Sequence, residues 1–286
     1  NIGIIHLCKP IDAGSFPDIL PSRMNARRFL PLLASLFFLA VAADAGTLVR
    51  FRTTLGDMGV ELYDQDKPVT CANFMRYVDA GRYTNIFFHR CLPSFVVQGG
   101  GFGVADPTST NPLALYIPVS PFNAITNEFG VGTRYSNVYG TIAMAKTTNS
   151  PDTATSQWFF NLADNSANLD NQNGGFTVFG HVIKGTNVLE QFNMRSMWNG
   201  IVNLDDGLFS ALPVTFSGMI WPHYNELIYV TVQPLSVEIR GGCAGQCSLQ
   251  WAGVAGMTNI VEYADTLSPE SWNFLLSTNP ANGLLN

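Results

Sequence analysis

The sequence is short of charge, of basic residues and of histidine. Only 13% of its 286 residues are Asp, Glu, Lys or Arg, and the net charge is −6 at pH 7. A chain with this acidic balance lacks the basic surface that nucleic-acid binding requires. Its four histidines are far apart, so no cluster with metal-ligand spacing is visible. We therefore expect no nucleic-acid partner, no metal and no other cofactor.

No apolar run in the sequence has the roughly 18 to 20 residues that a membrane span requires. A shorter run, from Phe29 to Val41, follows Arg27 and Arg28 and precedes Ala43-Asp44-Ala45. Basic residues, a short apolar run and a small-residue cleavage pattern are typical of a secretory signal peptide, here residues 24–45, rather than of a membrane anchor. We expect an exported protein, periplasmic or secreted, with no stable membrane insertion after signal cleavage.

Residues 1–23 precede Met24, where the signal peptide would begin, and the chain does not start with methionine. We interpret residues 1–23 as translated upstream sequence and leave them out of the predicted fold. Residues 1–45 hold four of the Lys and Arg residues and three of the Asp and Glu residues, so their removal changes the net charge from −6 to −7. The main folded domain is expected over residues 46–235.

Cysteine is also scarce, with five residues in the chain. We interpret Cys71 and Cys91 as buried free thiols. An oxidising compartment would favour a disulfide between Cys243 and Cys247, and no second pair accompanies them at metal-ligand spacing. Residues 236–286 contain short alternating runs at 237–239, 248–251 and 259–263. They favour a partial, truncated β-sandwich-like module.

Most of residues 46–235 has the pattern of short strands. Alternating runs at 48–53 and 60–63, joined by a turn-rich link at 55–59, predict an opening hairpin. Proline at position 68 and glycine at position 81 predict a helix between them. Further strands are expected at 140–144, 158–161, 177–180 and 226–232, with a second helix at 185–192. Segments 103–124 and 193–224 show no helical or strand period and are expected to be loops.

The stretch from Phe87 to Gly101 is apolar almost throughout but includes His89, Arg90 and Gln98, which are costly to bury without partners. Strands are expected at 86–88 and 95–97, separated by a Leu-Pro-Ser turn. Alternation would place Phe88 and Arg90 on one face and His89 on the other, so we interpret His89 as structural. The glycines after Gln98 do not form a phosphate-binding loop, because neither a helix nor a lysine follows them.

Four motifs follow one another along this part of the chain: Phe-His-Arg at 88–90, Phe-x-x-Gln-Gly-Gly at 95–100, Ser-Gln-x-Phe at 156–159 and Val-Phe-Gly at 178–180. In this order and at about these spacings they resemble the bacterial exported type of cyclophilin, the peptidyl-prolyl cis-trans isomerases, over residues 47 to 232. The resemblance implies a closed eight-stranded antiparallel β-barrel capped by two α-helices. It also implies catalysis of cis-trans isomerisation at X-Pro bonds.

Isomerisation of an X-Pro bond crosses a barrier of about 18 to 20 kcal/mol, because the amide has partial double-bond character. The reaction needs an apolar socket for the proline ring and a hydrogen-bond donor that favours the twisted amide. The resemblance assigns the donor to Arg90, with Phe95 and with Gln98, which orients Arg90, as the other catalytic residues. The implied substrate-binding residues are Val96, Ala145, Lys146, Gln157, Phe159, Leu169 and Phe176.

Some positions depart from the pattern of animal cyclophilins. Asn168 stands where those proteins carry a tryptophan, which should weaken cyclosporin binding more than catalysis. Val96 replaces a larger methionine, so we expect a slightly wider socket. Neither change removes Arg90, so neither argues for an inactive protein.

The expected partners are unfolded or flexible polypeptides that contain proline, bound by a monomer. An alternative function is a non-catalytic proline-peptide binding module or chaperone that uses the same groove. Substitution of Arg90 by Ala would separate the two functions, because only the enzyme needs the guanidinium for its activity.

Overall fold

The computed structural model describes residues 46–235, except 112, 114, 148–149, 205–206 and 216–220, together with the backbone of strands β1 and β15 to β19. The expected signal peptide, Cys243 and the side chain of Cys247 lie outside the described residues. Contacts divide the chain into two units. The larger contains residues 46–235 and strands β15, β16 and β19, and the smaller contains strands β1, β17 and β18.

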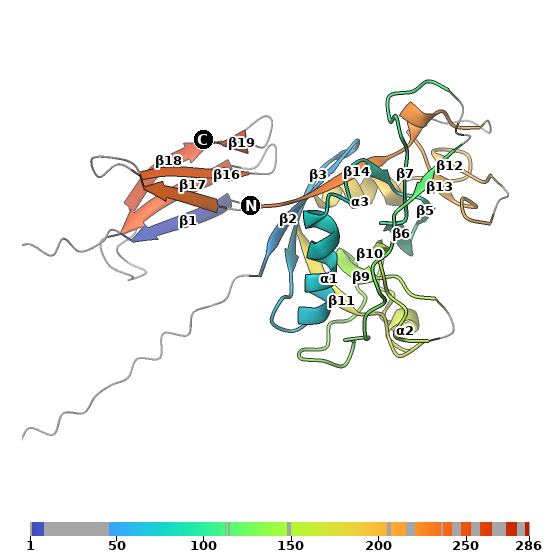
Figure 1. The fold of residues 1–286 in the computed structure, drawn as a ribbon, viewed down its shortest axis with the longest axis horizontal. Helices are drawn as coiled ribbons and strands as arrows, with labels where there is room; N and C mark the ends of the chain where they lie inside the picture. Colours follow the sequence, from blue (N-terminus) through green and yellow to red (C-terminus); the bar gives the residue numbers. More distant parts are fainter. Residues whose placement is uncertain are drawn as a thin grey trace, which may run out of the picture. The chain divides into compact units, whose positions relative to one another are not determined.

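The larger unit is built on one strongly curled antiparallel sheet (Figure 1), in the strand order β5-β6-β10-β9-β11-β3-β2-β14-β4-β7-β8. The expectation of a mainly β fold with few helices is confirmed. The bounds are β2 Leu48–Thr53, β3 Gly56–Leu62, β4 Ile86–Phe87, β5 Arg90–Leu92, β6 Val96–Gly99, β7 Phe102–Gly103, β8 Ile117–Pro118, β9 Thr141–Met144, β10 Trp158–Asn161, β11 Val178–Lys184 and β14 Tyr229–Pro234.

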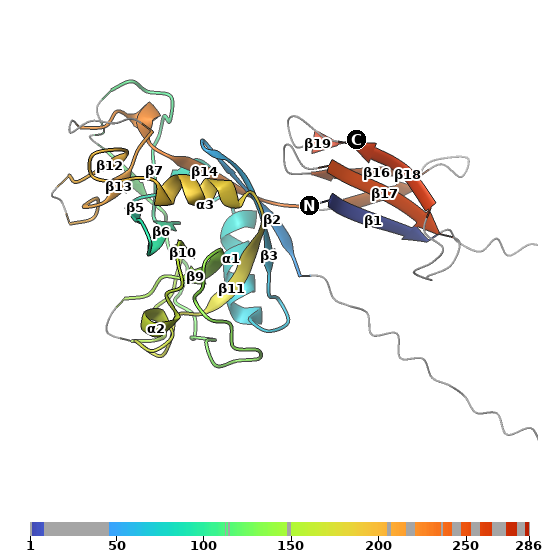
Figure 2. The ribbon, with the colours of Figure 1, turned by 180° about the vertical axis from the view of Figure 1, so that it is seen from behind.

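Two helices of useful length pack on the sheet, α1 (Pro68–Asp79) and α3 (Thr186–Asn193), and a single turn forms α2 (Ser166–Leu169). Figure 2 shows α1 and α3 beside the curled sheet. Both longer helices occur where the sequence predicts them. Each buries one apolar face, α1 through Phe74, Tyr77 and Val78 and α3 through Val188, Leu189 and Phe192. None of the described helices has the length and apolar composition to cross a membrane.

The main core fills the concave side of the sheet and is rich in aromatic rings. Trp158 of β10 lies edge-on to Phe51 of β2, with ring centroids 5.2 Å apart, and to Phe88, with centroids 5.7 Å apart. Phe88 in turn contacts Phe192 of α3 at 4.8 Å. Edge-to-face pairs of this kind stabilise a core beyond the area that they bury. These ring contacts therefore join distant strands of the sheet to one another and to helix α3.

The segment from β4 to β5 corrects the predicted alternation. Phe88 and Cys91 are fully buried in the main core, whereas Arg90 is half-buried on the opposite face. The prediction that Phe88 and Arg90 share a face is wrong, because Phe88 and His89 interrupt the strand. The backbone N–H of Phe88 donates to Ile228 O at 3.0 Å and that of His89 to Gln98 O at 3.0 Å. The alternation therefore shifts by one residue where the hydrogen-bonding partner of this segment changes from β14 to β6.

Three expected loops contain more structure than the sequence predicts, and one of them, 103–124, contains strand β8, which pairs with β7. Strand β3 begins at Gly56, inside the expected link 55–59, so the hairpin turn is shorter. The expected loop 193–224 contains the paired strands β12 (Ile201–Val202) and β13 (Leu212–Pro213). Its apolar residues pack with residues of the loop 103–124 and form a second cluster. Because they do not lie along a single helix or strand, the sequence shows no helical or strand period there. The cluster contains Phe87, Phe102, Val104, Leu113, Val202, Leu204, Phe209, Leu212, Val214, Leu227 and Tyr229.

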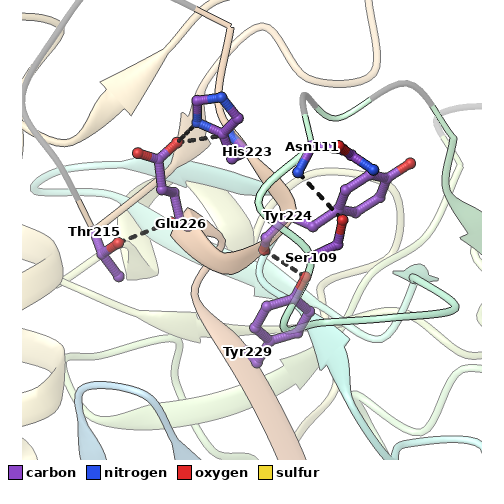
Figure 3. Close-up of polar contacts among 7 residues, drawn as sticks. All are labelled: Ser109, Asn111, Thr215, His223, Tyr224, Glu226 and Tyr229. Atoms are coloured by element: carbon purple, nitrogen blue, oxygen red, sulfur yellow. Dashed lines mark hydrogen bonds and ion pairs between the residues drawn. The ribbon is translucent and has the colours of Figure 1, made fainter.

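A short 3-10 helix, η1 (Tyr224–Glu226), connects the loops 103–124 and 193–224 to β14 through hydrogen bonds (Figure 3). The Tyr224 N–H donates to Asn111 O at 3.1 Å, and the Tyr229 hydroxyl donates to Tyr224 O at 2.7 Å. The backbone N–H of His223 donates to Glu226 Oε2 at 2.6 Å as part of a capping box around the turn, and His223 Nδ1 lies 3.0 Å from the same oxygen. The expected strand at 226–232 is consequently shifted, and β14 begins only at Tyr229.

The C-terminal strands form two small sheets. In the larger unit, β16 (Cys247–Ala252) pairs with β15 (Val237–Gly241) and with β19 (Leu284–Leu285). In the smaller unit, β17 (Thr258–Ala264) pairs in parallel with β1 (Ile2–Cys8) and antiparallel with β18 (Asn273–Thr278). The three runs predicted as strands fall within β15, β16 and β17. Strands β1, β18 and β19 are not predicted from the sequence.

Candidate active site

A row of side chains crosses the outer face of the sheet from β5 to β11. The strand registers place directly opposite one another, in turn, Arg90, Gln98, Phe159, Ala143 and Val178. Directly opposed residues of antiparallel neighbours lie on the same face of a sheet. The residues next to them in sequence, such as Val97 and Phe160, belong to the main core on the other face. The row therefore brings a guanidinium and an amide into line with apolar side chains.

The apolar end of this row is part of a cluster separate from the main core. Val96, Phe159 and Leu169 are buried there, and Phe95, Ala145 and Phe176 pack against them partly exposed. The Phe159 and Phe176 rings meet edge to face, with centroids 5.8 Å apart. The structure thus gathers six of the sequence-predicted site residues in one place. Its partly exposed rings can accept an apolar ring from outside.

The polar end of the row is held by a pair of glutamines. The side-chain amide of Gln98 donates to Gln157 Oε1 at 2.7 Å. The backbone carbonyl of Gln157 also accepts from the Ala145 N–H at 2.9 Å, which connects the pair to the end of β9. Gln98 is thereby fixed opposite Arg90, and Gln157 is fixed beside Ala145. The structure brings these four predicted residues together around the apolar cluster.

Arg90 is half-buried, and burial lowers the pKa of its guanidinium. An arginine side chain nevertheless stays protonated at any physiological pH, because its unperturbed pKa is so high. A cation that has lost part of its hydration makes stronger hydrogen bonds to a new acceptor than one in bulk water. Arg90 can therefore act as a permanently charged donor to a ligand that lies on the outer face.

His89, next to Arg90, is buried and packs edge-on against Phe102, with ring centroids 4.9 Å apart. Burial is the main cause that lowers the pKa of His89 to about 4; Gln157 acts in the opposite direction, and the charge on Arg90 makes a smaller lowering contribution. The imidazole is therefore neutral at neutral pH. This environment fits the structural role that the sequence predicts for His89.

Lys146 differs from the other predicted groove residues in its contacts. Its ammonium donates to the backbone carbonyls of Asn173, at 2.8 Å, and of Gly175, at 2.6 Å. It also lies 4.8 Å from the centre of the Phe176 ring. Lys146 therefore contacts the wall of the candidate groove, formed by residues 173–176.

Four residues of the apolar cluster were not predicted from the sequence. Ala143 and Val178 could have been found from strand alternation, since each is opposed to a predicted residue or its neighbour in the row. Tyr63 and Tyr135 stack with centroids 3.9 Å apart, and burial raises the pKa of Tyr63 to about 12. Tyr135 lies in a loop with no motif around it, so only the tertiary structure identifies it.

Within the described part of the chain, no group of three or more His, Cys, Asp or Glu residues is arranged to hold a metal ion. The candidate site itself consists of one arginine, one lysine, two glutamines and apolar groups. Its chemistry is therefore that of hydrogen-bond donation beside an apolar surface.

The chain is similar in sequence to a known protein family and to individual proteins. The family described as "Cyclophilin type peptidyl-prolyl cis-trans isomerase/CLD" matches residues 48–205. A "Peptidyl-prolyl cis-trans isomerase" of Acinetobacter baylyi is 41% identical over 150 residues, 52% of this chain and 73% of that relative. "Peptidyl-prolyl cis-trans isomerase A" of Dickeya dadantii is 40% identical over 177 residues, 61% of this chain and 85% of that relative.

Among solved structures, a cyclophilin type peptidyl-prolyl cis-trans isomerase of Cryptosporidium parvum, in the presence of the dipeptide Ala-Pro, aligns with a TM-score of 0.44 and 21% identity. The alignment covers 66% of this chain and 99% of that chain. Every residue of the row from Arg90 to Val178 lies inside the range matched by the family.

Proposed function

This chain belongs to the family of cyclophilin-type peptidyl-prolyl cis-trans isomerases and is an enzyme of that class, and we propose that it isomerises X-Pro bonds in exported polypeptides through Arg90. One observation carries the proposal: the strand registers align Arg90 with Gln98 and Phe159 on one face of the sheet. A charged donor and an apolar surface are the two components that this reaction requires.

Arg90 stabilises the twisted amide in this proposal. When the X-Pro bond rotates out of plane, conjugation is lost and the amide nitrogen becomes a hydrogen-bond acceptor. A half-buried guanidinium can donate to that nitrogen, whereas the planar amide offers no such acceptor there. Because the bond forms only in the transition state, it lowers the barrier without strengthening ground-state binding. Stabilisation by a few kcal/mol accounts for several powers of ten in rate, at about 1.36 kcal/mol each.

The apolar cluster holds the proline ring. Phe95, Val96 and Phe159 form the surface nearest to Gln98 along the strands, and Leu169 and Phe176 close its other side. Burying a ring of this size contributes on the order of 25 cal/mol for each Å² of apolar surface removed from water. Holding the ring fixed while the preceding carbonyl rotates converts that binding energy into catalysis. Gln98 and Gln157 keep the polar side of the socket in a constant geometry.

We further propose that the curled sheet closes into an eight-stranded barrel through the segment Ile86–Leu92. Support comes from its two hydrogen bonds, Phe88 N–H to Ile228 O and His89 N–H to Gln98 O. They join one continuous segment to β14 on one side and to β6 on the other. Strands β4 and β5 would then be two halves of one bent strand, and α1 and α3 would cap the barrel.

The setting is proposed from the sequence. The signal-peptide pattern at 24–45 supports export to the periplasm or beyond, and substrates there are newly exported chains whose X-Pro bonds isomerise slowly, over tens to hundreds of seconds. The protein would act as a monomer on flexible, proline-containing segments. The Ala-Pro dipeptide present with the Cryptosporidium parvum relative is the simplest such ligand.

NMR exchange spectroscopy on a short Ala-Pro peptide tests the proposal. The parent protein should accelerate cis-trans exchange, and Arg90→Ala should lose most of that acceleration while peptide binding, measured by titration, persists. Arg52→Ala is the matched control, because Arg52 is an exposed arginine on β2, outside the row. Full acceleration by Arg90→Ala would refute the role of Arg90. Peptide binding without acceleration by the folded parent would instead indicate a binding module.

A further inference from the structure

The wall of the candidate groove contains an unusual run of backbone. Asn173, Gly174 and Gly175 have φ angles of 51°, 74° and 77°. Three consecutive residues in the left-handed region are rare, because left-handed backbone crowds the Cβ of L-residues and makes no extended element. A Cβ added to Gly175 would lie 2.2 Å from the Phe129 ring, so glycine is required there. A segment of this kind persists only where its surroundings hold it.

Side-chain hydrogen bonds connect this turn to two neighbouring segments. Asn127 Nδ2 donates to Gly174 O at 2.8 Å, and Asn173 Nδ2 donates to Thr147 O at 2.7 Å. These are neutral amide contacts. Lys146 adds a charged contact, because its ammonium donates to two of the three carbonyls of the turn, those of Asn173 and Gly175. Charge-assisted hydrogen bonds of this type are about twice as strong as neutral ones.

The turn leads directly to Phe176, whose ring forms the groove wall. The Lys146 ammonium lies 4.8 Å from the centre of the Phe176 ring, within the range of a cation–π contact. The opposite neighbour of that ring is Phe159, at 5.8 Å between centroids. Lys146 therefore fixes both the backbone before Phe176 and the ring itself.

We propose that Lys146 is a positioning residue for the isomerase reaction, which gathers the Asn173 and Gly175 carbonyls and thereby keeps Phe176 against Phe159. This inference rests on the proposed place of Phe176 in the groove. Loss of the charge on Lys146 loosens the turn, so that the socket admits the proline ring less well. The effect appears mainly as an increase in KM, because the contacts of Lys146 are with the groove wall at Asn173, Gly175 and Phe176.

The charge on Lys146 can be removed at an accessible pH. Burial lowers the pKa of its ammonium to about 8, although the carboxylate of Asp152 acts in the opposite direction. The facing segment 171–176, Asn-Gln-Asn-Gly-Gly-Phe, has no titratable side chain. Glu128, on the segment that packs under Gly175, is turned to the Thr70 hydroxyl at 2.7 Å. Raising the pH through about 8 therefore deprotonates Lys146 first.

Burial also lowers the pKa of Lys67, whose ammonium lies 5.8 Å from the centre of the Tyr135 ring, whereas three further titratable groups near the site lie outside this window. The pKa of His89 is lowered to about 4 by burial, and those of Tyr63 and Cys91 are raised to about 12. Arg90 stays charged throughout. A loss of activity between about pH 7 and pH 9 that is absent from Lys146→Arg consequently reports on Lys146.

The test measures kcat and KM for an Ala-Pro peptide from about pH 6 to pH 10. In the parent protein, kcat/KM should fall about three- to tenfold through pH 8, mainly through KM. Lys146→Arg should keep activity over the whole range, because its charge does not titrate. Lys146→Met should be low and independent of pH. The matched control Lys184→Met, which removes a lysine of β11, should follow the parent. A flat parent profile, or full activity of Lys146→Met, would overturn the proposal.

A second readout does not depend on catalysis. In 1H–15N spectra of the parent protein, the amides of Gly175 and Phe176 should titrate with a midpoint near the pKa of Lys146, about 8, and should not do so in Lys146→Arg. Absence of this titration in the parent overturns the inference even if the enzyme is active. If the titration is present but exchange at the Ala-Pro bond is not accelerated, the contact of Lys146 with the turn is confirmed and the proposed function fails. Thermal unfolding of each variant shows whether the fold is retained.

Discussion

Arg90 and Gln98 lie directly opposite one another across strands β5 and β6, and the Gln98 side chain is held in turn by Gln157 at 2.7 Å. The row therefore has its polar groups at the edge of the apolar cluster and not within it. An arginine at this position can keep its charge partly hydrated while it donates to a ligand on the cluster. Three predictions follow from this arrangement and from its surroundings, beside the tests of Arg90 and Lys146.

The first prediction concerns coupling between Gln98 and Gln157. Gln98→Leu and Gln157→Leu should each lower kcat/KM by up to about tenfold, because one hydrogen bond of about 0.5–1.5 kcal/mol is lost in each. The double variant should lose little more than either single one, since both remove the same bond. Steady-state kinetics of the three variants measures this coupling. Strictly additive losses would mean that the two glutamines act separately.

The second prediction uses adjacent phenylalanines on opposite faces of β10. Phe159 belongs to the outer cluster and Phe160 to the main core. Phe159→Leu should lower kcat/KM by about tenfold or more, because it removes the aromatic wall of the socket. Phe160→Leu should cost on the order of 1–3 kcal/mol of unfolding free energy and leave kcat/KM near that of the parent. Urea unfolding and peptide kinetics of both variants make the comparison. If Phe160→Leu lowered kcat/KM and Phe159→Leu did not, the proline socket would lie on the core side of the sheet and not on the outer face.

The third prediction concerns acid stability. The folded state lowers the pKa of His89 to about 4, chiefly through burial, whereas an unfolded histidine titrates near pH 6.5. Between these values the unfolded state binds more protons, so the free energy of unfolding should fall as the pH decreases from about 6.5 to about 4. His89→Gln should show a weaker dependence, by up to a few kcal/mol over this window.

Urea midpoints measured at several pH values test the His89 prediction. His181→Gln is the control, because it removes a partly exposed histidine of β11 and leaves His89 in place. An unchanged slope in His89→Gln would mean that another buried group causes the acid sensitivity.

Prediction of the fold from the sequence succeeded where one element contains its own signal. Helix α1 begins at a proline and buries Phe74, Tyr77 and Val78 at helical spacing, so a local pattern is sufficient to locate it. Strand β10 was located with its correct bounds, because an apolar run is bounded by polar loops. Strands β12 and β13 were missed, since two-residue strands have no detectable period.

The residues of the candidate site can be proposed from sequence motifs, but their geometry cannot. The motifs identified Arg90, Gln98, Gln157 and Phe159, and the structure brings them together. Strand alternation misplaced Arg90 on the face of Phe88, because no local signal marks the interruption at Phe88 and His89. The interruption exists because the segment hydrogen-bonds to two different strands, and those partners are distant in sequence.

The sequence by itself determined the family, the mainly β class, both longer helices and the choice of candidate site residues, because each of these depends on a motif or a local period. Only the tertiary structure decided which face Arg90 occupies, that Lys146 binds the Asn173 and Gly175 carbonyls, and that Tyr63 and Tyr135 join the cluster. These features depend on strand register and on contacts between loops. Both are set by packing of segments far apart in the chain, where no local pattern specifies the partner.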